Sequence, residues 1–599
     1  MELLNLDGVI EKGVFEIPSY QRGYAWQMKQ LEDFWSDLEH VSKLENKFHY
    51  MHSLTLRKSD DDFGDIDFEI IDGQQRLATS LILLGLLAKI TQNKDPKYSL
   101  INLEPILSYK YYGLSEAFRA ITEEEKDLEI FQTSFYAKNL ISAYEFFKEK
   151  TSNITNPTLN KLLDALTKKM LFSVVELNDD RIDPFSSFET INNRGKDLST
   201  LELFKNRLHF VAHKICDEKE ELENLQKKIN DTYAIIYYDL RQFKDTHLDS
   251  FLKHFVAYYY GESGKKFKER LLETEFDAYK KYDAYPYDEY EKINELLFYV
   301  SCSSKVWYFL HTLDDEELGI EITPKMRDLL GKMRRLNALS DNAFLPLLLS
   351  LLTIQLVGRS GDERHYTTKE LEDLLEYLER FGFLVYGVAG RDTAKKQLIE
   401  LAFKAFRVHR LWEDKITIED LPVLEKDFFK GEHSGLELLE ESIHSKNNAE
   451  KWYQWGKALN YLLYEYELHH NPETTLNFDS SIESIEHILP QKPDQGYSAK
   501  EKSWAKNPYI VHALGNLLLI PKNANSSLSN KPFEEKRKAY LKGSYSEKEV
   551  AKNASFGVVQ IKERSERLLD FLIAHYNIAE LVGESAIKAF KNALLKDIK

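Results

Sequence analysis

The spacing of apolar residues changes twice along this 599-residue chain. In the first 215 residues, short runs are apolar or alternating and in part β-branched or aromatic: Val14 to Pro18, Ser53 to Arg57, Phe68 to Ile71 and Leu171 to Leu177. Such runs favour strands, and helical stretches lie between them. From about residue 216 to residue 430 the pattern becomes one of long helical periods with few strand candidates.

Strand-like segments return near the end of the chain. They lie at Ser481 to Ile488 and Leu517 to Ile520, between predicted helices at Ala449 to His469 and in the 556–597 tail. This order indicates a small ββα unit held among helices. Because 599 residues exceed what one core usually supports, we predict a multidomain, mainly α protein with α+β parts. Its parts are an α+β domain over 1–215, a helical middle over 216–430 and a C-terminal domain over 431–599.

No segment predicts a membrane span. The longest apolar run, Phe344 to Val357, is shorter than the roughly 20 residues that cross a bilayer, so we interpret it as a buried helix. The first residues carry no basic region ahead of a hydrophobic stretch, which argues against a secretory signal. We therefore expect a cytoplasmic protein without a membrane partner.

The two cysteines, Cys216 and Cys302, have no second cysteine at metal-ligand spacing. This excludes a zinc knuckle and a disulfide framework as organising features. Two free buried thiols are the favoured interpretation, and a single long-range bridge stays open.

The net charge of −18 argues against a protein that coats DNA without specificity, because Lys and Arg supply most non-specific affinity for phosphates. A contact with DNA must then be local. From Pro521 to Lys542 six positive charges face two negative ones, a local excess of four: Lys522, Lys531, Lys536, Arg537, Lys538 and Lys542 against Glu534 and Glu535. A solvated helix face is the alternative interpretation of this segment.

The C-terminal part gathers residues that suit phosphodiester cleavage. That reaction needs a base to activate water and a Lewis acid beside the scissile phosphate. His487 can be the base, because an imidazole titrates near neutral pH. Glu486 and Asn525 offer the hard oxygen ligands that Mg²⁺ or Mn²⁺ prefers. Asn516 is expected to brace the His487 segment through hydrogen bonds to the backbone.

Glu486-His487-Ile488-Leu489-Pro490-Gln491, the Leu-Gly-Asn-Leu sequence ending at Leu517, and Asn525 together resemble the core of the His-Asn-His (HNH, ββα-metal) nucleases. The stretch from Asn530 to Tyr540 also resembles the segment that follows this core, and within it Lys536 is expected to approach a phosphate. Other histidines, including His512, are not selected by their spacing.

Three polar clusters precede helices in the N-terminal part. The first holds Gln21 and Arg22, and the second is Asp72-Gly73-Gln74-Gln75-Arg76, where a strand meets a helix. Gly73 permits the tight turn, and free N–H groups at the helix start favour an anion. The third holds Asn193, Arg194 and Lys196. The clusters could converge on one phosphate-bearing ligand, although each alone is more often a capped helix start.

These segments resemble the N-terminal domain of the GmrSD-type restriction endonucleases. The resemblance implies a ParB/sulfiredoxin-like fold over 1–215 that binds and hydrolyses a nucleoside triphosphate through the box from Asp72 to Arg76. Nucleotide-site candidates are then Gln21, Arg22, Asp72, Gly73, Gln74, Gln75 and Arg76, with Asn193, Arg194 and Lys196. The Walker loop of P-loop enzymes is absent. One departure is His52, where related sequences often carry glycine.

Together the two ends predict a single-chain, modification-dependent (type IV) restriction endonuclease. A nucleoside triphosphate would license metal-dependent cleavage of modified double-stranded phage DNA, and two-strand cutting would favour a homodimer. Glucosylated hydroxymethylcytosine DNA and phosphorothioate-marked DNA are both implied substrates, and the sequence does not choose between them. Two alternatives stay open: a nucleotide-switched DNA- or partner-binding regulator with a non-cutting nuclease domain, and an RNA-cleaving toxin.

Overall fold

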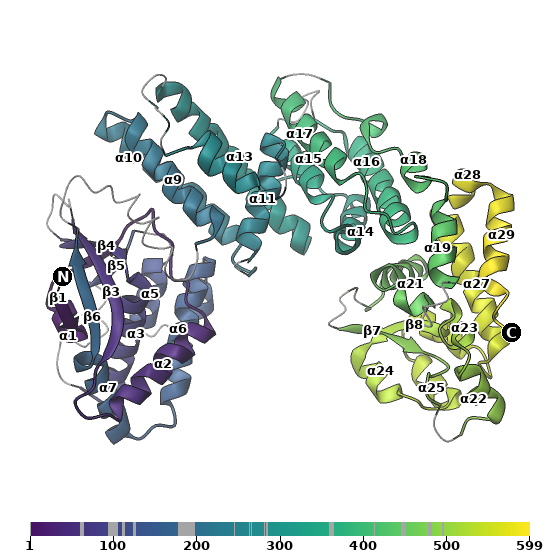
Figure 1. The fold of residues 1–599 in the computed structure, drawn as a ribbon, viewed down its shortest axis with the longest axis horizontal. Coiled ribbons are helices and arrows are strands. Elements are labelled where there is room, and N and C mark those ends of the chain that lie inside the picture. The colour runs from purple at the N-terminus through teal and green to yellow at the C-terminus, as the bar shows by residue number, and fades with distance from the viewer. Residues whose placement is uncertain are drawn as a thin grey trace. The chain divides into compact units, whose positions relative to one another are not determined.

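The computed structural model describes residues 2–599 except 60–64, 94–105, 111–113, 124–126, 178–197, 245, 263, 265, 279, 281, 283–285, 359–364, 412–413, 445–450, 477, 479–481 and 494–495. The contacts between residues divide the chain into two compact units, Met1–Phe309 and Leu310–Lys599. The division falls within the long helix α13 (Pro286–Thr312) (Figure 1). The three-domain division drawn from the sequence stays a prediction.

The first unit contains a mixed six-stranded sheet in the order β1-β6-β3-β4-β2-β5. Its strands are β1 (Glu2–Asn5), β2 (Phe15–Ile17), β3 (His49–Lys58), β4 (Phe68–Asp72), β5 (Leu107–Tyr109) and β6 (Met170–Glu176). β3 runs parallel to β6 and antiparallel to β4, whereas β2 runs parallel to both β4 and β5. The four strand-like runs of the N-terminal part are thus confirmed as β2, β3, β4 and β6.

Helices pack beside this sheet and against one another (Figure 1). The central one, α3 (Gln74–Ile90), is buried around nearly its whole circumference, which explains why its sequence is apolar without a polar face. The other helices of the unit are α1 (Leu6–Ile10), α2 (Met28–Ser42), α5 (Leu114–Glu123), α6 (Phe135–Thr151), α7 (Asn156–Lys168), α9 (Thr200–Ile215), α10 (Lys219–Asp239), α11 (Thr246–Tyr260) and α12 (Lys266–Glu269).

Two residues with positive φ shape the turns around β3 and β4. Gly73, between β4 and α3, has a φ of 100°, and a Cβ there would come within 2.9 Å of the Ser53 carbonyl oxygen. His52 has a φ of 63° where the pairing of β3 with β6 shifts register. That conformation favours glycine. The His52 departure therefore places a side chain on a left-handed backbone.

In the second unit, the described residues form helices and one pair of strands. β7 (Glu483–His487) pairs antiparallel with β8 (Leu517–Pro521), and α24 (Lys522–Leu528) follows β8 directly. The remaining longer helices are α14 (Pro324–Ser340), α15 (Leu345–Val357), α16 (Thr368–Phe381), α17 (Lys395–Leu411), α19 (Gly435–His444), α21 (Lys457–His470), α25 (Phe533–Tyr540), α27 (Val558–His575) and α29 (Glu584–Leu595). Shorter helices are α18 (Leu424–Phe428), α20 (Lys451–Gln454), α22 (Ala499–Ala505), α23 (Pro508–Val511), α26 (Tyr545–Ala551) and α28 (Ile578–Val582).

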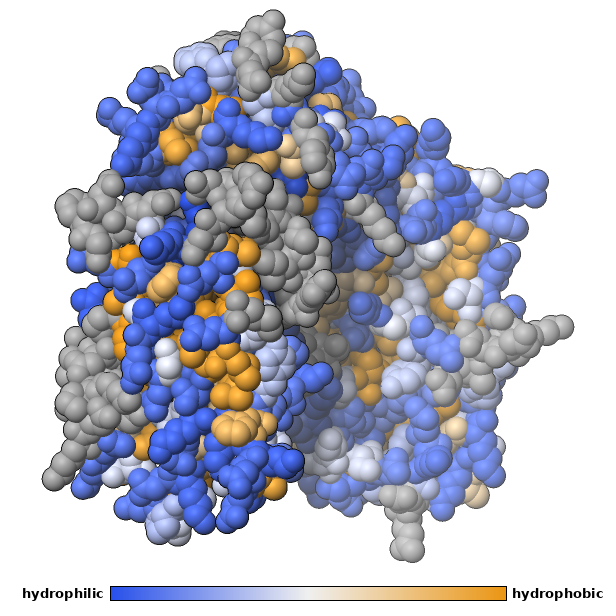
Figure 2. Space-filling view, turned by 60° about the vertical axis from the view of Figure 1, so that its left-hand side comes forward, coloured by the Kyte–Doolittle hydropathy of each residue, from blue (hydrophilic) through white to orange (hydrophobic). Residues whose placement is uncertain are grey.

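The described residues contain no helix that is both long and apolar enough to cross a membrane. The apolar run from Phe344 forms the buried helix α15, as predicted. Cys216 and Cys302 are both free thiols. Figure 2 shows hydrophilic residues over most of the face that it draws, with smaller apolar areas between them.

Glu379 is a carboxyl group buried in the core of the second unit. The hydroxyls of Tyr461 and Tyr576 donate to its Oε1 at 2.6 and 3.1 Å. Burial raises the pKa of Glu379 from 4.5 to about 7, against the lowering effects of Tyr461 and Lys332. An acid whose pKa is raised by folding stabilises the protein fully below its unfolded pKa, and this contribution is lost as the pH rises through the folded pKa.

We therefore expect Glu379→Gln to weaken the pH dependence of stability. A pKa shift of this size corresponds to a loss of about 3 kcal/mol in the free energy of unfolding between pH 4.5 and pH 7. The glutamine keeps an oxygen acceptor for both tyrosines but does not titrate. Urea unfolding at pH 5 and pH 8 should show a smaller loss of unfolding free energy in the variant than in the wild type. Equal losses in the two proteins would contradict the assignment.

Candidate active site

The paired strands β7 and β8 place the predicted nuclease residues in one compact region. Glu486 and His487 lie at the end of β7, opposite Leu518 and Leu517 of β8. Asn516 immediately precedes β8, and Asn525 lies in α24, which follows it. A strand, a second antiparallel strand and a helix therefore follow one another, in the order expected from the sequence.

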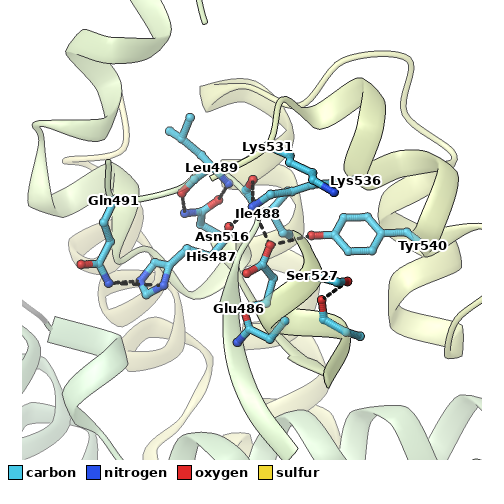
Figure 3. Close-up of polar contacts among 12 residues, drawn as sticks. Glu486, His487, Ile488, Leu489, Gln491, Asn516, Ser527, Lys531, Lys536 and Tyr540 are labelled. Carbon is cyan, nitrogen blue, oxygen red and sulfur yellow. Dashed lines mark hydrogen bonds and ion pairs between the residues drawn. The ribbon is translucent and has the colours of Figure 1, made fainter. Parts of the chain in front are cut away.

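The His487 imidazole is buried, with 8% of its surface exposed. Its Nε2 lies 3.0 Å from Nδ1 of His512, and the two rings are nearly perpendicular. The Gln491 amide nitrogen lies 3.4 Å from each ring nitrogen of His487 (Figure 3). Burial, followed by the charges of His512 and Lys536, lowers the pKa of His487 to about 3. The ring is therefore neutral at neutral pH, and an anion bound beside it would raise its affinity for a proton.

Asn516 is completely buried and links three backbone segments. Its Oδ1 accepts from the Leu489 N–H at 2.7 Å, and its Nδ2 donates to the carbonyls of Leu489 and Val511 at 2.9 and 2.7 Å. These are the contacts that a bracing residue makes. Because Val511 precedes His512 and Leu489 follows His487 closely, Asn516 ties together the segments that carry both histidines.

The turn around Asn516 rests on α27. The buried Arg564 side chain donates to the carbonyls of Gly515 and Leu517 at 3.0 and 2.7 Å, and the Gly515 N–H donates to Ser565 Oγ at 2.8 Å. A Cβ at Gly515 would collide with the backbone of α27 at Ile561. Close approach of the two backbones thus requires glycine here.

Lys536 is buried, although the sequence predicts that it approaches a phosphate. Its side chain is 0% exposed, and its Nζ donates to Glu486 Oε1 at 2.5 Å and to the carbonyls of His487 and Ile488 at 2.9 and 3.3 Å (Figure 3). The Tyr540 hydroxyl donates to the same Glu486 oxygen at 3.1 Å. An ammonium enclosed in this way does not reach a phosphate, so the expected phosphate contact does not fit the structure. Lys536 instead supports the backbone at His487.

The two expected metal ligands differ in how well they fit a divalent ion. Glu486 is 4% exposed, and its carboxylate is engaged by Lys536, whose positive charge would oppose a cation beside it. Asn525 fits better. Its Nδ2 donates to Ser484 Oγ and to the Ile485 carbonyl at 2.8 and 3.2 Å, which orients the amide and leaves its oxygen outside these bonds.

Among the described residues, no group of three or more His, Cys, Asp or Glu side chains is placed to hold a metal ion. This does not disagree with Asn525 as a ligand, because Mg²⁺ usually keeps several waters and needs only one or two protein oxygens beside a phosphate. Asn525 is therefore the residue of the expected pair whose donor chemistry and orientation suit such an ion.

In the N-terminal unit, several expected nucleotide-site residues hydrogen-bond the protein itself. The Gln75 amide donates to the Gly23 carbonyl and accepts from the Ala25 N–H, and Gln21 donates to the Ile70 carbonyl. Arg76 donates to the Ser53 carbonyl at 2.7 Å and to Asp72 at 3.2 Å. These bonds join the segment after β2 to the turn between β4 and α3. The first two clusters are thus brought together.

Two residues of these clusters are arranged differently. Gln74 is buried, and its side-chain oxygen accepts no hydrogen bond within the described part of the chain. Arg22 lines a cavity of about 340 Å³, together with Phe135, Tyr136, Ser199, Glu202 and Asp249 among others. The third cluster, Asn193, Arg194 and Lys196, lies outside the described residues.

His512 and Tyr540 are the site residues that the sequence did not reveal. His512 follows the short helix α23 and Tyr540 is the last residue of α25, and neither spacing nor composition distinguishes them. Only the fold brings His512 to His487 and Tyr540 to Glu486.

Two family models match the chain. The model described as "GmrSD restriction endonuclease, N-terminal domain" matches residues 3–209, and the model described as "GmrSD restriction endonucleases, C-terminal domain" matches residues 439–571. The first contains all three polar clusters of the N-terminal part, and the second contains every residue of the His487 site. No curated protein sequence matches the chain.

Proposed function

This chain belongs to the GmrSD restriction endonucleases, and from that premise we propose that it is a type IV enzyme whose β7–β8–α24 unit is an HNH-type nuclease acting on modified phage DNA. The observation that carries the proposal is the buried imidazole of His487 at the end of β7, beside the segment braced by Asn516. A neutral imidazole accepts a proton, as the base of a phosphodiesterase must.

In the proposed reaction, His487 takes a proton from a water molecule whose oxygen attacks phosphorus, and the bond from phosphorus to the leaving oxygen breaks. The negative charge of the phosphate raises the proton affinity of the imidazole when DNA is bound, which offsets the effect of burial. Asn516 and Lys536 hold the backbone from His487 to Leu489, so that the ring keeps its position during the reaction.

A divalent ion, Mg²⁺ or Mn²⁺, would supply the positive charge that stabilises the leaving oxygen. Asn525 is the residue proposed to hold it. We expect Asn525→Ala to raise the metal concentration needed for half-maximal cleavage at least about tenfold, because an oriented oxygen ligand is lost. Cleavage should be titrated with Mg²⁺ in the wild type and the variant, with the exposed Asn523→Ala in the same helix as the matched control. An unchanged requirement would remove Asn525 from the metal site.

Local positive charge supports contact with DNA despite the net charge of −18. Of the six basic residues between Pro521 and Lys542, four are exposed: Lys522, Lys531, Lys538 and Lys542. Arg537 donates to the Ala551 carbonyl, and Lys536 is buried. The exposed lysines lie in or beside α24 and α25, which adjoin the β7–β8 pair, and can neutralise phosphates near the site.

The N-terminal unit is proposed to bind and hydrolyse a nucleoside triphosphate and so license cleavage in a cytoplasmic defence system. Arg22 and the aromatic walls of the cavity support this proposal, because a guanidinium suits phosphate or carbonyl acceptors and aromatic rings suit a base, whereas Glu202 and Asp249 in the same lining oppose phosphate groups near them. A ligand acts on the nuclease only through its different affinity for two states of the protein.

The function is tested by incubating the full chain with modified and unmodified phage genomes and with total RNA, while each nucleotide and each metal is varied separately. We expect cleavage of a modified genome that requires both a triphosphate and Mg²⁺ or Mn²⁺. Cleavage of RNA alone would indicate a toxin. Nucleotide-dependent DNA binding without cutting would indicate a regulator with an inactive nuclease unit.

A further inference from the structure

The side chains of His487 and His512 are in hydrogen-bond contact. We propose that His512 is a positioning residue that fixes the tautomer of His487, so that Nδ1 of His487 is the atom that accepts the proton from the attacking water. This inference rests on the proposed nuclease function and adds to it the reacting atom and the residue that selects it.

The contact itself limits the proton positions. Nε2 of His487 and Nδ1 of His512 lie 3.0 Å apart, a hydrogen-bond distance, and both rings are buried. A neutral imidazole has one N–H donor and one acceptor nitrogen, so one ring must donate and the other accept. The pair therefore has two arrangements when both rings are neutral.

Only one arrangement leaves His487 able to act as a base. If His512 donates, Nε2 of His487 accepts that bond and Nδ1 carries the proton, so neither nitrogen has a lone pair for water. If His487 donates from Nε2, its Nδ1 is unprotonated and can take a proton. In the second arrangement His512 accepts through Nδ1 and carries its own proton on Nε2.

Gln491 does not select between the two arrangements. Its amide nitrogen lies 3.4 Å from both Nδ1 and Nε2 of His487, so it can donate weakly to whichever nitrogen carries no proton. The contact with His512 is therefore the one that distinguishes the two nitrogens, because it involves Nε2 alone.

The fold also holds His512 in place. His512 caps α23, where its N–H donates to the Pro508 carbonyl at 3.2 Å, and Asn516 donates to the neighbouring Val511 carbonyl. The ring centroid of Tyr453 lies 5.0 Å from the ring centroid of His487 and 6.1 Å from that of His512. Because Asn516 also binds Leu489, the same side chain sets the position of both histidines.

Two substitutions at His512 distinguish the effect of its hydrogen-bond acceptor from the effect of its ring volume. His512→Phe keeps a planar ring but has no acceptor, whereas His512→Asn places an amide oxygen near the position of Nδ1. We expect His512→Phe to lower kcat for DNA cleavage about 10- to 100-fold with KM little changed, as losses of partners that orient a reacting group usually do. We expect His512→Asn to recover most of the lost rate.

The controls distinguish this inference from the proposed function. The exposed His433→Phe is the matched control and should cleave as the wild type does. Hydrogen exchange of the β7 and β8 peptides shows whether a variant is folded, and His512→Leu replaces His512→Phe if the latter unfolds this region. If the wild type cleaves no DNA, or His487→Ala cleaves as fast as the wild type, the nuclease function itself fails.

Several outcomes would overturn the role of His512 while leaving the nuclease in place. These are a wild-type rate in His512→Phe, an effect on KM alone, and equal losses in His512→Phe and His512→Asn. A fourth is inhibition by Zn²⁺ that His512→Phe relieves, since nitrogens 3.0 Å apart also suit two ligands of one zinc ion. That result would assign the pair to metal binding.

Discussion

His487→Ala is expected to lower the rate of DNA cleavage by at least about 10²-fold, while hydrolysis of the nucleoside triphosphate continues. A positioned general base usually contributes 10²- to 10⁴-fold. Alanine removes the imidazole but leaves the Lys536 bond to the carbonyl of residue 487, because that bond is made by the backbone. The loss should therefore reflect chemistry and not local unfolding.

The two activities should be measured on the same preparation, with a modified genome as the DNA substrate. His433→Ala is the control, since this exposed histidine of the same unit lies outside the site. DNA cleavage at the wild-type rate in His487→Ala would show that another group is the base. Loss of triphosphate hydrolysis together with cleavage would show that the substitution disturbs more than the nuclease unit.

Lys536→Met is expected to destabilise the region around β7 by about 3 to 5 kcal/mol, the usual cost of breaking a buried ion pair on one side. The Glu486 carboxylate would lose its only ion-pair partner among the described residues and stay in an environment that already raises its pKa through burial. The carbonyls of His487 and Ile488 would lose the same donor. Cleavage should fall with stability, because these carbonyls belong to His487, the proposed base, and to the residue after it.

A double substitution tests whether the loss of stability comes from leaving one charge of the buried ion pair without its partner. Glu486→Gln/Lys536→Met removes both charges and should recover much of the lost stability, since a buried pair can often be replaced by neutral groups at little cost. Hydrogen exchange of the β7 and α25 peptides measures the local free energy of opening. Lys538→Met, an exposed lysine in the same helix, should match the wild type. A double variant no more stable than Lys536→Met would contradict the pairing.

The secondary structure was largely predictable where local pattern determines it. The apolar stretches of β2, β3, β4 and β6 and the helix α15 were found, because strongly apolar runs have few alternatives in a folded chain. The strands β1 and β5 were not predicted. The predicted helix from Ala449 to His469 is interrupted at Gly456, whose φ of 61° separates α20 from α21.

The candidate site was predictable only as far as its motif extends. His487, Asn516 and Asn525 could be chosen from residue type and order, and the structure places them around one pair of strands. The location of the Lys536 ammonium could not be foreseen, because a lysine in a charged segment is normally exposed. Its burial depends on a carboxylate 50 residues earlier in the chain. The contact between His487 and His512 depends on tertiary packing in the same way.

The support that α27 gives to the Asn516 turn determines how small an excised nuclease fragment can be. A fragment ending at Tyr545 would contain His487, Asn516, Asn525 and Lys536. It would lack Arg564, whose guanidinium donates to the carbonyls of Gly515 and Leu517. Such a fragment would carry the complete motif on an unsupported loop. Anyone transplanting this catalytic module into another protein would therefore need to retain the chain through His575, the last residue of α27.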